Sequence, residues 1–125
     1  MDRVQVINHQ GKEIVYIDFS NIMVTEIETL RKVIEAAKEI IKKYPPASAL
    51  TLVNFDNLRF SAQFISELKE FTLHNKPYVK MGAAFGVHQG VRKVVFDAVM
   101  KFTGRNLHVC DSKEEGLDWL VSNCS

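Results

Sequence analysis

The sequence predicts an α/β fold in a single domain, with elements in the order β-β-α-β-α-β-α-β-α. A nearly unbroken apolar run at 50–53 is typical of an inner strand in a mostly parallel sheet. Segments with helical spacing of apolar residues alternate with β-rich segments, and neither a repeat nor a linker interrupts them. This alternation implies right-handed crossovers. We therefore expect a five-stranded, mostly parallel sheet with one antiparallel edge strand, and helices mainly on one face.

Two β-rich runs open the chain, at 3–8 and 13–19. They are joined by His9-Gln10-Gly11-Lys12, and a glycine in a short polar connection is typical of a hairpin. The hairpin would make the first strand the antiparallel edge of the sheet.

The first helix is the most strongly marked element of the sequence. Thr25 and Glu28 have the spacing of a capping box at its start. Apolar residues then fall on one stripe from Ile27 to Tyr44. Pro45-Pro46 ends the helix, because proline lacks the N–H that would continue it.

The central strand at 49–54 leads through a polar loop into a second helix. Asn54, Asp56 and Asn57 interrupt the apolar run with side chains that favour turns. Ser61 is suited to cap the helix that follows. The inward face of that helix is predicted to carry Phe64, Ile65, Leu68 and Phe71.

A strand at 78–85, a glycine-bearing turn at 86–90 and a helix at 91–102 follow. A short strand at 107–110 comes next, and Ser112 with Glu115 would cap the closing helix. The helix at 91–102 is apolar on more than one stripe. We assign its core side to Val91, Val94, Val95, Ala98, Val99 and Phe102. Phe96 and Met100 fall outside this stripe, where they would form a dimer or apolar lipid-facing patch or be covered by the last helix.

Helices that step along the sheet in the same sense would share one face. Tyr16, Thr51, Lys80 and His108 are polar residues between apolar neighbours, and we expect them on the opposite face.

Composition narrows the class of protein. The 125 residues have a formal net charge of +1, which argues against a nucleic-acid partner held by phosphate neutralisation. The start of the chain has no apolar signal region, and no apolar run approaches the roughly 20 residues of a membrane span. Cys110 and Cys124 form neither a disulfide framework nor a metal motif, so we expect reduced thiols, no cofactor or metal, and a cytoplasmic location.

Polar residues are predicted to gather where the strands end. The carboxyl ends of parallel strands are the usual ligand or partner site of open α/β sheets. The residues expected there are Asp18, Asn54, Asp56, Asn57, Gly86, His88 and Arg92. His88 and Arg92 lie one helical turn apart, so both could reach one phosphate or carboxylate, or they could be the exposed start of a helix. The chain contains no Gly-x-Ser-x-Gly, His-Glu-x-x-His or Cys-x-x-Cys motif, so we expect a non-catalytic protein.

Three segments of the chain resemble the SpoIIAA-like members of the STAS domain family. They are Gly11 with Ile14–Ser20, then Lys76–Val87, and finally Glu114–Leu120. The resemblance covers nearly the whole chain but rests mostly on core and turn positions. It implies a bacterial regulatory domain that binds a protein partner, in the manner of the anti-sigma-factor antagonists.

The resemblance also implies a phosphorylation site. In the antagonists a serine at the start of the helix after the central strand is phosphorylated, within an Asp-Ser-Ser-Gly-like motif. Here Phe60-Ser61-Ala62-Gln63 occupies that place, without the aspartate or the glycine, so Ser61 is either a phosphorylation site or a plain helix cap. The rival function is a small-molecule or lipid-binding carrier, as in lipid-transfer domains of related fold. In that case Phe85, Phe96, Met100 and Phe102 would line or flank a pocket for an apolar or anionic ligand.

Overall fold

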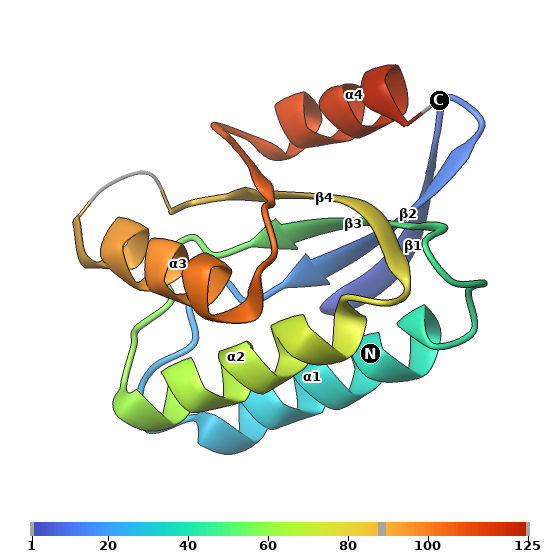
Figure 1. Cartoon of the computed structure of the whole chain (residues 1–125). Helices are drawn as coiled ribbons and strands as arrows, with labels where there is room; N and C mark the ends of the chain where they lie inside the picture. Colours follow the sequence, from blue (N-terminus) through green and yellow to red (C-terminus); the bar gives the residue numbers. More distant parts are fainter. Residues whose placement is uncertain (1, 88–89, 125) are drawn as a thin grey trace.

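The computed structural model describes residues 2–87 and 90–124, and its elements follow the predicted order (Figure 1). The strands are β1 (Val4–His9), β2 (Lys12–Asp18), β3 (Ala49–Asn54), β4 (Val79–Phe85) and β5 (His108–Cys110). The helices are α1 (Ile27–Ile41), α2 (Ala62–Asn75), α3 (Gly90–Thr103) and α4 (Lys113–Asn123). The five strands form one sheet in the order β1-β2-β3-β4-β5. β1 pairs with β2 antiparallel and the other neighbours pair in parallel, so the predicted fold class is confirmed.

The hairpin is a tight turn of two residues. His9 pairs with Lys12 across it, and Gln10 and Gly11 have φ values of 51° and 83°. Positive φ at both central residues gives the turn a twist that matches the flanking strands. The predicted hairpin is therefore confirmed.

The start of α1 differs from the prediction. The N-cap is Glu26, and among the described residues no side chain caps it. The Glu26 carboxylate instead accepts a hydrogen bond from the Met23 N–H at 2.9 Å, within the preceding loop. The capping box predicted at Thr25 is wrong, because its spacing falls before the helix begins. The caps predicted at Ser61 and Ser112 are confirmed, each serine accepting from the N–H three residues later.

The sheet has a helical layer on each face. Figure 1 shows α1, α2 and α3 together on one side of the sheet and α4 alone on the other. Successive side chains of each strand point to opposite faces of the sheet and so pack against different helical layers. Val15, Ile17 and Val53 belong to the apolar cluster under α1–α3, and Ile14, Leu50 and Leu52 belong to the cluster under α4.

Helix α4 covers the face that we expected to be free of helices. It approaches the sheet closely at Gly116, where a Cβ atom would fall 2.5 Å from Leu52 Cδ1. His108 stacks on Trp119 of α4 with ring centroids 4.1 Å apart. The Lys113 Nζ lies 4.5 Å from the centroid of the Tyr16 ring.

Three of the four polar residues expected on this face are there. Tyr16 and His108 contact α4, and the Lys80 ammonium donates to the carbonyl oxygen of Cys124. Thr51 is the exception. It is 2% exposed and lies on the α1–α3 face, because it alternates with Leu50 and Leu52 along β3.

Candidate functional site

The carboxyl ends of the parallel strands meet in register at one edge of the sheet. Asp18 of β2 pairs with Asn54 of β3, Asn54 with Phe85 of β4, and Phe85 with Cys110 of β5. Asp18 and Asn54 are therefore brought together as predicted, and Gly86 follows directly after Phe85.

Asp18 and Asn54 use their side chains to hold the loops of this edge. The Asp18 carboxylate accepts from the Ser20 N–H at 2.8 Å, and Asn54 Oδ1 accepts from the Asp56 N–H at 2.9 Å. These contacts are the local turns that Asx side chains favour. The Asn54 amide also donates to the Tyr16 hydroxyl at 3.2 Å. Burial raises the pKa of Tyr16, and the hydrogen bond from Asn54 opposes that shift.

The loop after β3 is locked against the loops after β2 and β4. The Asn21 N–H donates to the Asp56 carbonyl at 3.0 Å, and Gly86, with a φ of +83°, packs directly against Asp56. Asn57 has a φ of 55°, a left-handed conformation that asparagine tolerates. The side chains of Asp56 and Asn57 remain exposed on this fixed backbone.

Ser61 is the N-cap of α2. Its Oγ accepts a hydrogen bond from the Phe64 N–H at 3.1 Å, and the residue is half-buried. The predicted cap is thus confirmed, whereas phosphorylation of Ser61 stays a prediction.

Of the two residues predicted to bind an anion at the start of α3, His88 lies outside the described residues. Arg92 is half-buried. Its Nε is buried with no hydrogen-bond partner among the described residues.

Helix α3 presents a different face to the core than the sequence predicts. Phe96 is 7% exposed and meets Phe55 edge to face at 6.3 Å, and Met100 is half-buried. The outward residues are Val91, Val94 and Phe102, which are 71%, 69% and 60% exposed. Of the two alternatives for Phe96 and Met100, an exposed patch is therefore wrong. Cover by the last helix is wrong too, because α4 lies on the other face of the sheet (Figure 1). The cause is that α3 is apolar on more than one stripe, so periodicity alone does not select the buried one.

Exposed apolar residues occur on two of the segments that follow strands at this edge, the loop after β2 and the start of α3. Met23 and Val24 are exposed in the loop after β2, and the Arg59 N–H joins this loop to the next one through the Ile22 carbonyl at 3.1 Å. Val91 and Val94 lie in the first turns of α3, which begins at Gly90. We call this region the edge surface and define it by Met23, Val24, Asp56, Asn57, Val91 and Val94.

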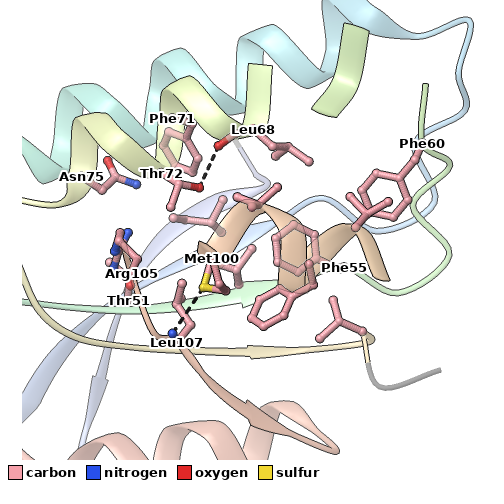
Figure 2. Close-up of a pocket in the computed structure, with 16 residues that line it drawn as sticks. Thr51, Phe55, Phe60, Leu68, Phe71, Thr72, Asn75, Met100, Arg105 and Leu107 are labelled. Carbon is pink, nitrogen blue, oxygen red and sulfur yellow. Dashed lines mark hydrogen bonds between the residues drawn. The ribbon is translucent and has the colours of Figure 1, made fainter. Parts of the chain in front are cut away.

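A cavity of about 40 Å³ lies between β3, α2 and α3. Figure 2 shows Phe55 and Phe60 at one end of it, and Thr51, Asn75 and Arg105 at the other. Phe96 and Met100 line it, as the carrier hypothesis expects. Phe85 instead belongs to the apolar cluster under α4, and Phe102 points outward.

The sequence reasoning missed the polar end of this cavity. Asn75 and Arg105 belong to no motif in the sequence, and neither was among the predicted site residues. The one available signal was a basic residue directly after Gly104, the glycine that ends α3.

Both cysteines are free and buried. The Cys110 thiol donates to the Ala84 carbonyl at 3.5 Å, and burial raises its pKa to about 11. A thiol with so high a pKa is a poor nucleophile at neutral pH. Cys110 therefore acts as a small apolar residue of the core. Within the described residues, no group of three or more His, Cys, Asp or Glu side chains is placed to hold a metal ion.

Comparison of the chain with protein-family models and with curated proteins gave no match. None of the helices in the described part of the chain has the length and apolar character needed to cross a membrane.

Proposed function

We propose that this protein is a non-catalytic protein-binding module and that its partner docks on the edge surface. The observation that carries the proposal is the outward orientation of Val91 and Val94 at the start of α3, where both are about 70% exposed. Apolar residues grouped at one place on a protein surface, with a polar rim, are typical of interaction sites. Asp56 and Asn57 supply the polar rim.

The backbone of the edge surface is fixed before a partner arrives. The Asx turns at Asp18 and Asn54 and the packing of Gly86 against Asp56 hold its loops. A preorganised surface binds more tightly, because less conformational freedom is lost on association. This rigidity supports a recognition role for the loops.

Ser61 supports a regulated interaction of the STAS type. It caps α2 directly after the loop that carries Asp56 and Asn57. A phosphate at this position would add negative charge beside the edge surface and would be favoured by the helix N-terminus. We therefore propose that phosphorylation of Ser61 changes partner binding, as expected of a cytoplasmic bacterial regulator.

The size of the cavity does not favour a lipid carrier. Sites for drug-sized ligands occupy roughly 300–1,000 Å³. The cavity of about 40 Å³ is far smaller, so a lipid would require α3 to move away from the sheet.

The experiment compares two charge substitutions at exposed positions. The tagged protein is isolated from its own cells as wild type, Val94→Asp and Glu35→Lys; Glu35 is an exposed residue of α1, away from the edge surface. We expect a co-purifying protein with wild type and Glu35→Lys that is lost with Val94→Asp, while all three proteins keep the same melting temperature. Retention of the same protein by Val94→Asp would contradict the proposal.

A further inference from the structure

The cavity under α3 has a polar end, and several hydrogen-bond donors there have no acceptor among the described residues. Thr51 is 2% exposed and Asn75 is 3% exposed, and Arg105 lines the same end (Figure 2). Within the described part of the chain, neither the Thr51 hydroxyl nor the Arg105 guanidinium has a hydrogen-bond or ion-pair partner. Asn75 Oδ1 lies 3.0 Å from His74 Nδ1, which leaves the Asn75 amide N–H groups without a partner there. Arg105 is half-buried, and the three side chains line the cavity, so their unused donors are available to a ligand that enters it.

The unused groups can all donate a hydrogen bond, and one of them carries a positive charge. Thr72, which also lines the cavity, already donates its hydroxyl proton to the Leu68 carbonyl at 2.7 Å and can only accept. Lys76 adds a second positive charge close by, because its ammonium donates to the Thr103 carbonyl at 3.2 Å, two residues before Arg105. A guanidinium fork with neighbouring N–H and O–H donors matches a carboxylate.

The rest of the cavity is apolar. Phe55, Phe71 and Phe96 line it together with aliphatic side chains, and these surfaces exclude water from an ion pair formed at Arg105. Arg105 is half-buried, and this burial lowers the pKa of its guanidinium. An anion that binds there would supply the missing counter-charge.

The volume limits the size of the ligand. A single water occupies roughly 10–15 Å³ of such a volume, so a cavity of about 40 Å³ accepts only a small ligand. We propose that the cavity binds a short-chain aliphatic carboxylate, with the carboxylate on Arg105, Thr51 and Asn75 and the alkyl end toward Phe55 and Phe96. This site is separate from the edge surface and does not depend on the proposed protein-binding function.

The test uses sodium butyrate as the probe. Methyl NMR spectra of the full chain are recorded during titration at constant ionic strength set with sodium chloride. We expect saturable shifts of the Thr51, Val95 and Val99 methyl signals, with a Kd on the order of 1 mM for so small a ligand. Butan-1-ol and butylammonium chloride, which lack the carboxylate, should not produce saturable shifts at the same concentrations.

Two substitutions that remove one positive charge separate the site from a general charge effect. Arg105→Met should weaken butyrate binding by at least about tenfold, whereas Lys101→Met, at an exposed position of α3, should change it by less than about twofold. Butyrate should raise the melting temperature of the wild type, and this increase should be absent in Arg105→Met, because the variant lacks the guanidinium that holds the carboxylate. Thr51→Val should weaken binding while preserving the shape of the side chain.

Three results would overturn the proposal. They are the absence of a saturable shift in the wild type, an equal response to butan-1-ol, and unchanged butyrate affinity in Arg105→Met. Because the edge-surface experiment uses Val94 and a protein partner, failure of one proposal leaves the other standing.

Discussion

A Cβ atom added to Gly86 would fall 2.5 Å from the backbone nitrogen of Asp56, closer than real Cβ atoms approach another atom. This contact joins the loop after β4 to the loop after β3 and so fixes the centre of the edge surface. Gly86 also has a φ of +83°, which side chains rarely adopt. The glycine is therefore required for two independent reasons.

Gly86→Ala should be considerably more destabilising than the same change at another left-handed glycine. Gly11 is the matched control, because it has the same φ of +83° and nothing within 4 Å of an added Cβ. We expect Gly11→Ala to lower the free energy of unfolding by about 1 kcal/mol and Gly86→Ala by about 3 kcal/mol, measured by urea denaturation. Equal losses would show that the contact between Gly86 and Asp56 contributes little.

Substitutions at Ser61 should separate its capping role from its proposed regulatory role. Ser61→Ala should lower the free energy of unfolding by about 1 kcal/mol, because the Phe64 N–H loses its acceptor. Ser61→Asp should stay within about 0.5 kcal/mol of wild type, because aspartate caps equally well. If phosphorylation regulates binding, Ser61→Asp should nevertheless alter partner capture. If a stable Ser61→Asp protein captures as much partner as the wild type does, Ser61 serves only as the helix cap.

The two faces of α3 should respond in opposite ways to truncation. Phe96→Ala removes a buried ring that packs on Phe55 and should cost about 3 kcal/mol or more. Val94→Ala, at an exposed position, should stay within about 0.5 kcal/mol of wild type. Chemical denaturation of both variants measures this difference. If Val94→Ala lowered the free energy of unfolding strongly and Phe96→Ala did not, the core side of α3 would be the one predicted from the sequence.

Tyr44 should make stability depend on pH in the alkaline range. Burial, followed by the hydrogen bond that its hydroxyl donates to Glu13 at 2.9 Å, raises the pKa of Tyr44 to about 12. Because this pKa lies above the ordinary value of 10.0, the contribution is present in full below pH 10 and is lost as the pH rises toward 12. Tyr44 is partly open to solvent, so we expect less than about 1 kcal/mol.

The measurement for Tyr44 is urea denaturation of wild type and Tyr44→Phe at several pH values from about 9 to 12. The difference between the two proteins should shrink as the pH rises, since phenylalanine does not ionise. Parallel curves across this range would show that the hydrogen bond to Glu13 does not stabilise the fold. Burial also raises the pKa of Tyr16 and of Cys110. Both residues are present in both proteins, so their effects cancel in the difference between wild type and Tyr44→Phe.

The sequence carried enough information for the topology and for the placement of the edge. The apolar run of β3, the hairpin glycine and the polar residues after each strand are local signals, and the rules for parallel strands convert them into neighbours in space. That Asp18, Asn54 and Gly86 meet at one edge could therefore be predicted.

The buried face of α3, the position of α4 and the position of Arg105 depend on long-range packing, which the sequence does not show. Helix α3 has apolar side chains on several sides, so the choice of Phe96 over Val94 for the core depends on the space beside Phe55. The rule for crossovers did not place α4, whose close approach at Gly116 appears only in three dimensions. Arg105 is charged and follows a helix, a pattern typical of solvent-exposed positions, and only the structure brings it to a cavity beside Thr51 and Asn75.

The most direct test of the edge surface is site-specific photo-crosslinking in the protein's own cells. A photoreactive phenylalanine analogue replaces Val94 in one protein and Glu35 in another, since both positions are exposed. We predict a crosslinked product from position 94 that is absent from position 35, and its mass will distinguish a different protein from a second copy of this chain. A folded protein that gives no product from position 94, or the same product from both positions, would contradict the account.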